Sequence, residues 1–324
     1  MKTNRGTDCG LAGFHRRWFG GWRAWTGGAL VELIFLGAVA GRAAETSAAT
    51  RGPADLTELS IEQLLDIKVT SVSKKEEKVS DAAAAIHVIT QDDIRRSGVT
   101  SIADALRLAP GMEVARMNAH DWAITARGFN DVFANKLLVM IDGRSVYTPL
   151  FSGVYWDVQD TLLSDIDRIE VIRGPGATLW GANAVNGVIN IITKKAQDTQ
   201  GGLVSGGGGT EEQGFGSIRY GGKLGPNAFY RVYGKYFNRD DSKTRDGIDA
   251  NDRWQMARGG FRADWTPNDR NSLTLQGDAY AGRVHQTYFP LSPVSPYPAT
   301  PTPDGYSVEG GNLLGRWTHT LSDT

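Results

Sequence analysis

The sequence contains little cysteine, no excess of either charge and no long hydrophobic run beyond its N-terminal region. The single cysteine, Cys9, lies near the N-terminus, so neither a disulfide framework nor thiol chemistry is expected in the rest of the chain. Lys and Arg number 35, and Asp and Glu number 36. This balance argues against a nucleic-acid-binding protein, which usually carries a basic excess. The mean hydropathy is negative, which argues against a helical membrane protein.

Signatures of enzymes are also lacking. Gly176 and Gly181 have the spacing of a phosphate-binding loop, but Ala182 and Asn183 stand where Lys and Ser or Thr are required. The five histidines show no metal-ligand spacing, and the acidic segment 246–252 lacks the distal Glu of a calcium loop. We therefore expect no catalytic residue, no resident metal and no cofactor, so the protein is not predicted to be an enzyme.

The N-terminal region has the features of an export signal. Arg16 and Arg17 precede the apolar run 29–40, and that run ends in the small residues 38–40, as a cleavage site requires. A run of about twelve residues is too short to span a bilayer comfortably, so a cleaved signal is favoured over a membrane anchor. Residues 1–44 are interpreted as a signal peptide.

Residues 45–79 are interpreted as a periplasmic leader. Its first part, 45–55, is small and polar, and Ser60 with Gln63 predicts the capping box of a short helix. Residues 67–73 alternate in polarity and favour an extended strand.

Residues 80–195 alternate between strand and helix signals and predict a small α/β domain. Thr90 is expected to cap a helix that ends at Gly98, and Ser101 to cap a second helix. The dipeptide 142–143, Asp-Gly, predicts a hairpin turn. Apolar and β-branched runs predict strands at 85–89, 112–116, 122–127, 136–141, 168–173 and 187–193.

From about residue 200 the pattern changes to longer segments with strict alternation. In one of them Val232 and Tyr236 face one way, while Arg231 and Lys235 face the other. A soluble β-sandwich would show the same alternation. Six strands are expected, near 201–208, 214–223, 228–238, 253–265, 271–283 and 310–320.

The connections favour a membrane barrel over a soluble sheet. Short turns at 225–227 and 267–269 alternate with long polar segments at 239–252 and 285–308, the asymmetry of outer-membrane barrels. About six strands cannot close a wide pore, and an open edge in lipid leaves backbone groups unpaired. Residues 200–324 are therefore expected to be the first part of an incomplete barrel. Aromatic residues at positions typical of membrane-interface girdles are Phe229, Trp254, Trp265 and Trp317.

Ordered motifs resemble the plug domain of TonB-dependent receptors. They are Pro110-Gly-Met-Glu-Val114, Ala126-Arg-Gly-Phe129, Leu137-Leu-Val-Met-Ile-Asp-Gly-Arg144, and the stretch 168–193, which resembles the C-terminal signature of these plugs. Trp180 and Asn186 depart from the commonest pattern, which has tyrosine and glycine there. The resemblance covers about residues 80–195.

The resemblance implies an α/β plug folded inside a 22-stranded barrel in the outer membrane of a Gram-negative bacterium. It implies import of a scarce small-molecule ligand, most often an iron–siderophore complex. A TonB-type protein of the inner membrane would supply the energy, and the barrel would contact lipid. Cobalamin, other metal chelates, haem and saccharides remain alternative ligands. A truncated, non-transporting binding remnant and a signalling receptor also remain open.

Three sets of site residues follow from the resemblance. The candidate TonB box, which could add a strand to its partner, is Ile67, Lys68, Val69, Thr70, Ser71, Val72 and Ser73. A lock between plug and barrel is assigned to Arg127, Glu170 and Arg173. Ligand contacts in the outward-facing plug loops are assigned to Asn118, His120, Asp121, Trp122, Phe151, Ser152, Tyr155 and Trp156. Each set has an ordinary alternative. The candidate TonB box could be a plain linker strand, and the lock residues could form an ion pair inside the plug. The ligand-contact residues could instead pack against the barrel wall.

Overall fold

The computed structural model describes residues 68–69, 77–78, 84–288 and 301–321, all within one compact unit, Pro53–Thr324. The predicted signal peptide, the helix predicted from Ser60, and residues 67 and 70–73 of the candidate TonB box lie outside the described residues. None of the helices in the described ranges is long and apolar enough to cross a bilayer.

The plug is built on a five-stranded mixed sheet with strand order β3-β8-β9-β6-β7. Strands β6 and β9 pair in parallel, and the other neighbours are antiparallel. A separate hairpin pairs β4 with β5. These strands are β3 (Ile86–Thr90), β4 (Met112–Arg116), β5 (Trp122–Ala126), β6 (Leu137–Ile141), β7 (Arg144–Ser145), β8 (Ile166–Arg173) and β9 (Gly187–Thr193).

Two short helices precede the hairpin, and both caps are as predicted. Helix α2 (Gln91–Ser97) begins with a capping box between Thr90 and Asp93, and it ends at Gly98 in the left-handed conformation. The Ser101 hydroxyl accepts a hydrogen bond from the backbone of Asp104 at the start of α3 (Ile102–Ala105). The chain then continues as the 3-10 helix η3 (Leu106–Leu108).

The turn between β6 and β7 is also as predicted. Ile141 pairs with Arg144, and φ is +49° at Asp142 and +81° at Gly143. Two successive positive φ values define the hairpin turn that suits twisted strands, which explains the Asp-Gly pair. The remaining short elements of the plug are η4 (Leu163–Asp165), α4 (Ala177–Trp180) and η5 (Ala196–Thr199).

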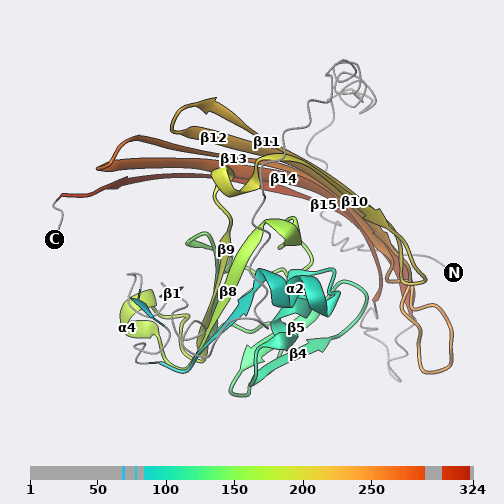
Figure 1. Ribbon diagram of the computed structural model, residues 1–324. Helices are drawn as coiled ribbons and strands as arrows, with labels where there is room; N and C mark the ends of the chain where they lie inside the picture. The colour runs from blue at the N-terminus through green and yellow to red at the C-terminus, as the bar shows by residue number, and fades with distance from the viewer. Residues whose placement is uncertain (1–67, 70–76, 79–83, 289–300, 322–324) are drawn as a thin grey trace, which may run out of the picture. The chain divides into compact units, whose positions relative to one another are not determined.

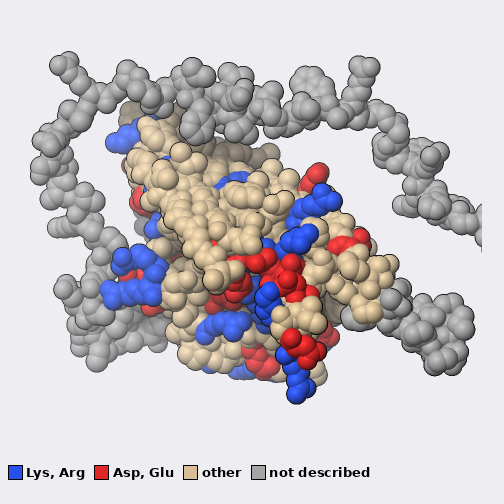
Figure 2. All heavy atoms as spheres, turned by 90° about the vertical axis from the view of Figure 1, so that its right-hand side faces the viewer, with Lys and Arg blue, Asp and Glu red and all other residues tan. Residues whose placement is uncertain are grey.

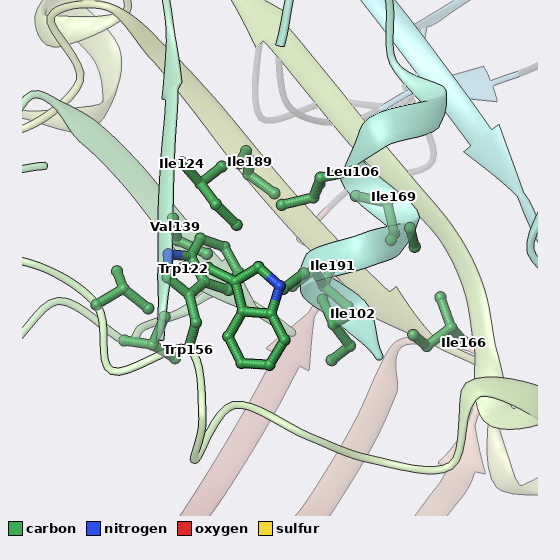
Figure 3. Close-up of a cluster of buried hydrophobic side chains, with 14 of the residues drawn as sticks. Ile102, Leu106, Trp122, Ile124, Val139, Trp156, Ile166, Ile169, Ile189 and Ile191 are labelled. Atoms are coloured by element: carbon green, nitrogen blue, oxygen red, sulfur yellow. The ribbon is translucent and has the colours of Figure 1, made fainter. Parts of the chain in front are cut away.

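The core of the plug has two apolar clusters. The smaller one contains Leu138, Met140, Ile172, Ala184 and Val188. The larger one is drawn from helices and strands and also contains Phe237, Trp254, Met256 and Val284 of later strands (Figure 3). Ile169 of β8 and Ile191 of β9 are fully buried in it, because both faces of the central strands are covered. Trp122 and Trp156 also lie within the cluster. Burial of apolar surface on this scale is the main stabilising term for a domain of this size.

The second layer is a six-stranded antiparallel sheet in sequential order, β10 to β15. Figure 1 shows these strands as one curved sheet. Their bounds are β10 (Gly201–Gly207), β11 (Glu212–Gly225), β12 (Ala228–Arg239), β13 (Trp254–Asn268), β14 (Asn271–Tyr288) and β15 (Thr302–His319). All six predicted strands are present.

The last two strands are longer than predicted. Strand β14 continues to Tyr288, and β15 begins at Thr302 rather than near residue 310. The proline-rich sequence suggested a loop, but Pro303 pairs opposite Thr287. Pro303 lies at the start of β15, and the start of a strand tolerates a residue without a backbone donor.

The two faces of the sheet differ as the alternation predicts. Val232 and Tyr236 are exposed, whereas the neighbouring Arg231 is buried. Trp265 and Trp317 are exposed, as girdle positions require. The girdle prediction for Trp254 is wrong. Its ring is buried, because the side chain points to the inner face of β13 and packs against His120, Trp122 and Phe237.

Candidate functional site

Plug and sheet meet along a polar seam. Five consecutive strands each direct one polar side chain onto the plug ends of β6, β8 and β9. These side chains are Arg219 of β11, Arg231 of β12, Arg262 of β13, Gln276 of β14 and Arg316 of β15. We call these five residues, together with Asp142, Asp165 and Thr193 of the plug, the seam.

Asp142 is the first centre of the seam. Its carboxylate accepts hydrogen bonds from the backbone and hydroxyl of Thr193, at 2.9 and 2.8 Å. It also accepts a 2.8 Å bond from the amide of Gln276, and Arg316 donates to its backbone carbonyl. The hydroxyl of Thr193 in turn accepts a 3.0 Å bond from Arg262. One turn residue thus joins β9 to three strands of the sheet.

Asp165 is the second centre, directly before β8. Its two oxygens lie 2.5 Å from the guanidinium of Arg219 and 3.5 Å from that of Arg231. Both Asp165 and Arg231 are buried. Arg231 also donates to the carbonyl of Lys194 at 2.6 Å. Removing one partner of such a buried pair costs roughly 3–5 kcal/mol, because the other charge stays buried without compensation.

Further polar contacts continue the junction beyond the seam. Lys235 of β12 pairs with Asp160 at 2.7 Å. Arg258 of β13 donates to the carbonyl of Val158 at 2.5 Å and pairs with Asp278 of the next strand. Hydrogen bonds and ion pairs of this kind can be replaced by hydrogen bonds to water, whereas apolar contacts have no such replacement.

The loop between β4 and β5 contacts the sheet at a second place. The backbone N–H of Ala119 donates to the carboxylate of Asp252 at 2.8 Å, and Asp252 also accepts from the backbone and hydroxyl of Ser242. The ring Nε2 of His120 lies 3.1 Å from the carbonyl oxygen of His285 in β14. The plug loop is therefore tied to the β12–β13 connection and to β14.

The residues assigned to ligand contact form two groups in the structure. The side-chain oxygen of Asn118 accepts hydrogen bonds from the backbone N–H groups of His120 and Asp121, which orders this loop locally. In the other loop Phe151 stacks on Tyr155 with ring centroids 4.0 Å apart, and Ser152 has a positive φ of 57°. Figure 2 shows one face of the molecule, on which acidic and basic side chains lie interspersed.

Three of these residues are buried. Trp122, Trp156 and His120 lie inside the plug or against the sheet. Figure 3 shows the rings of Trp122 and Trp156 among the core side chains. Their contact with a ligand remains a prediction, and it would require the loops to move. Phe151 is half-buried and Tyr155 is exposed, so the aromatic stack is the accessible part of the predicted set.

The two loops are electrostatically linked through Asp157. Burial raises the pKa of Asp157 to about 6, and the nearby carboxylate of Asp121 adds to the rise. For His120 burial acts to lower the pKa, but the carboxylate of Asp121, 3.4 Å from the ring Nδ1, and that of Asp157 outweigh it and leave the pKa raised. The described residues contain no group of three or more His, Cys, Asp or Glu side chains that could hold a metal.

The lock residues gather at the end of β8 that lies away from the seam. Arg173 is the last residue of β8, and with a rise of about 3.3 Å per residue it lies roughly 25 Å from Asp165. Arg127 is exposed with φ of +61°, and a Cβ on Gly174 would lie 3.3 Å from its guanidinium. Glu170 is buried and accepts a 2.8 Å bond from Arg168 of the same strand. The assignment of these residues to a lock remains a prediction.

Two residues of the candidate TonB box are described. Lys68 and Val69 form β1, which pairs antiparallel with β2 (Glu77–Lys78). Val69 is buried. A strand that already has one neighbour presents a single free edge to a partner. The position of the box remains a prediction.

Sequence reasoning missed the seam and the Asp252 contact. Alternation did predict that Arg231 points away from the face that carries Val232 and Tyr236, and the same pattern in β13 places Arg262 likewise. It could not pair them with Asp142 and Asp165, because those partners lie far away in the sequence. The available signal was a row of arginines on the inward faces of β11, β12, β13 and β15, since such charges need partners when buried.

Comparisons with known proteins agree with this architecture. Residues 78–188 match the family model of the TonB-dependent receptor plug domain. The chain thus carries a TonB-dependent receptor plug domain, followed by antiparallel strands whose fold resembles that of a receptor barrel.

Curated relatives of the chain include vitamin B12 transporters. The chain is 31% identical over 153 residues to the vitamin B12 transporter BtuB of Vibrio vulnificus, a match that covers 47% of this chain and 24% of that protein. It is 32% identical over 147 residues to BtuB of Photobacterium profundum, covering 45% and 23%. The chain thus matches about a quarter of the length of these relatives.

Two solved structures share the fold. Pseudomonas aeruginosa FpvA bound to heterologous pyoverdines superposes with a TM-score of 0.58 at 17% identity, covering 79% of this chain and 34% of FpvA. The ferric yersiniabactin uptake receptor FyuA from Yersinia pestis gives 0.55 at 19% identity, covering 72% and 38%.

Proposed function

We propose that this protein acts in TonB-dependent import, by binding a scarce small molecule outside the cell and admitting it when the plug is rearranged. The observation that carries the proposal is the polar junction between plug and sheet. The plug is held by ion pairs and hydrogen bonds such as Asp160–Lys235, which can break and re-form. Apolar side chains such as Trp254 and Met256 also pack on the plug, so polar and apolar contacts hold it together. No bond of the ligand changes in this process, so the protein acts as a transporter and not as an enzyme.

The proposed ligand is a metal chelate, first an iron–siderophore complex. The stacked pair Phe151 and Tyr155 suits a large ligand with rings or flat chelating groups. Cobalamin is the second candidate, favoured by the relatives named as vitamin B12 transporters. That match covers only 24% of the relative's length, so an experiment must decide between the two candidates.

The proposed partner is a TonB-type protein of the inner membrane. Residues 67–73 would add a strand to it, with backbone hydrogen bonds supplying affinity. Within the described part of this segment, β1 is paired with β2, and recruitment would either use the free edge of β1 or replace β2. The lock proposed for Arg127, Glu170 and Arg173 would hold the closed plug at the end of β8 opposite the seam.

The test is uptake in the host organism. The gene is deleted and restored, and accumulation of isotope-labelled cyanocobalamin and of iron-loaded siderophores is compared. Import of one probe should fall at least tenfold on deletion and return on complementation. A collapsed membrane potential should have the same effect, because the partner needs it. Unchanged accumulation of every probe would refute the metal-chelate proposal.

A further inference from the structure

His120, in the loop between β4 and β5, lies between two hydrogen-bond acceptors. Its ring Nε2 is 3.1 Å from the backbone carbonyl oxygen of His285 in β14, and its Nδ1 is 3.4 Å from one carboxylate oxygen of Asp121. The other oxygen of that carboxylate accepts a 2.7 Å hydrogen bond from the amide of Asn118, which orients the group towards the ring. Neither a carbonyl nor a carboxylate can donate a proton, so both ring nitrogens face groups that only accept.

This arrangement favours the protonated form of the ring. A neutral imidazole carries a single N–H, so one of its nitrogens would turn a lone pair towards an acceptor. His120 is 1% exposed, and within the described residues its Nδ1 has no hydrogen bond of ordinary geometry. An imidazolium donates at both nitrogens and places its positive charge beside the carboxylate of Asp121. The closed loop is therefore complete when the ring is charged.

The charges around the ring support the same form. Burial acts to lower the pKa of His120, but Asp121 and Asp157 leave it raised. Burial acts to raise the pKa of Asp121, but His120 and Asn118 leave it lowered. These opposite directions are those of an ion pair. Other charged, titratable or aromatic groups around this pair are Arg116, Arg239, Asp252, Trp254 and Tyr306.

The ion pair also orders the loop that is predicted to meet the ligand. His120 joins the loop to β14, while the neighbouring Ala119 joins it to Asp252. The carboxylate of Asp121 is held from two sides, by the ring and by Asn118. Because His120 is buried, it can act on a ligand only by fixing these neighbours.

We propose that His120 is a positioning residue, whose protonated ring holds the plug loop 117–121 on β14, so that ligand binding weakens when the ring loses its proton. The inference rests on the proposed function and makes the predicted outward-facing site sensitive to the pH outside the cell. The contribution of the ring is complete below the ordinary histidine pKa of about 6.5. It is lost as the pH rises through the raised pKa of the folded protein.

The first measurement needs no ligand. Amide hydrogen exchange of residues 117–121 is followed by mass spectrometry in the complete gene product, and each rate is divided by that of an unstructured peptide at the same pH. Between about pH 6.5 and about pH 9 the protection of the loop should fall about tenfold. His120→Gln should abolish this fall, because an amide does not titrate. His285→Gln is the matched control, since it removes a neighbouring imidazole but keeps the backbone carbonyl, and it should retain the native profile.

Asp121→Asn separates the proposal from a merely structural role. A contacting carboxylate raises a histidine pKa by about one unit or more, so this substitution should move the fall in protection to lower pH by about that amount. A fall that persists in His120→Gln, or that stays in place in Asp121→Asn, would overturn the proposal.

The second measurement connects the loop to ligand binding. Isotope-labelled cyanocobalamin and iron-loaded siderophores are bound to isolated outer membranes over the same pH range. For the probe that binds, the dissociation constant should rise about threefold or more in the native protein and in His285→Gln. It should stay constant in His120→Gln. An equal rise in all three proteins would come from the probe and would overturn the positioning role.

The two measurements also distinguish failure of this inference from failure of the proposed function. Loop protection that does not change with pH would overturn the role of His120 and leave import standing. A loop that responds to pH as described, in a protein that neither binds nor imports any probe, would refute the metal-chelate function. The hydrogen-exchange result would then still support the ion pair of His120 with Asp121.

Discussion

The carboxylate of Asp252, at the end of the β12–β13 connection, accepts a 2.8 Å hydrogen bond from the backbone N–H of Ala119 in the plug. Asp252 is buried and also accepts from Ser242. A single side chain thus joins a loop of the sheet to a loop of the plug that is predicted to meet the ligand. This arrangement couples the order of the two loops.

Replacement of Asp252 by alanine should therefore loosen both loops. Three donors lose their acceptor, and an unsatisfied buried donor costs about 1–3 kcal/mol. We expect a lower free energy of unfolding by this amount, measured by urea titration with tryptophan fluorescence, and at least a threefold weaker ligand affinity. Asp249→Ala is the matched control, because Asp249 pairs with Lys243 in the same connection but both are exposed. Equal effects of the two substitutions would contradict the role given to Asp252.

The stability of the plug should depend on pH through Asp157. Its pKa is raised by burial to about 6, so the folded state keeps a proton that the unfolded chain releases from about pH 4 upward. The contribution of Asp157 to the free energy of unfolding should be greatest below pH 4 and fall by on the order of 2 kcal/mol as the pH rises to 6. His120, with its raised pKa, should add a further loss only above its ordinary value of 6.5.

Asp157→Asn should remove the part of this dependence between pH 4 and 6, since the amide cannot titrate. Unfolding midpoints in detergent at a series of pH values provide the measurement. Asp269→Asn, in an exposed turn, is the control and should leave the profile of the native protein unchanged. A profile that keeps its slope between pH 4 and 6 in Asp157→Asn would show that another group titrates there.

Gly187 begins β9 where two strands approach closely. A Cβ at this position would lie 2.5 Å from the carbonyl oxygen of Ile172 and 3.2 Å from a methyl group of Leu137. Gly187→Ala should therefore lower the free energy of unfolding by about 1–3 kcal/mol through overpacking, as followed by urea titration. Gly202→Ala in β10, where no atom lies within 4 Å of the added Cβ, should change it far less. If Gly187→Ala left the free energy of unfolding unchanged, β8 and β9 would be able to separate at little cost.

Local features of the fold were predictable because their causes are local. The capping box of Thr90 with Asp93 and the positive φ values of Asp142 and Gly143 follow from neighbours in the sequence. The inward arginines were predictable as well, since alternation along a strand assigns the face. Pro303 misled because the local sequence suggests a loop, whereas the pairing of β15 with β14 extends over this residue.

Features that depend on long-range contacts were not predictable. Trp254 looks like an interface residue in sequence, but β13 turns it towards Trp122 of the plug. The pairing of Asp165 with Arg219 and Arg231 joins residues more than fifty positions apart. Their types and spacing indicate that partners are needed, but only the arrangement of strands and plug decides which carboxylates supply them.

The central claim is that an energy-transducing partner acts on the plug through the segment before it. The direct measurement is uptake after deletion of residues 67–73 in the complete gene product, with binding of the same labelled chelate to intact cells measured in parallel. Uptake should fall at least tenfold while surface binding stays within about twofold of the native protein. Uptake at the native level, with the altered receptor present at equal abundance, would contradict the claim.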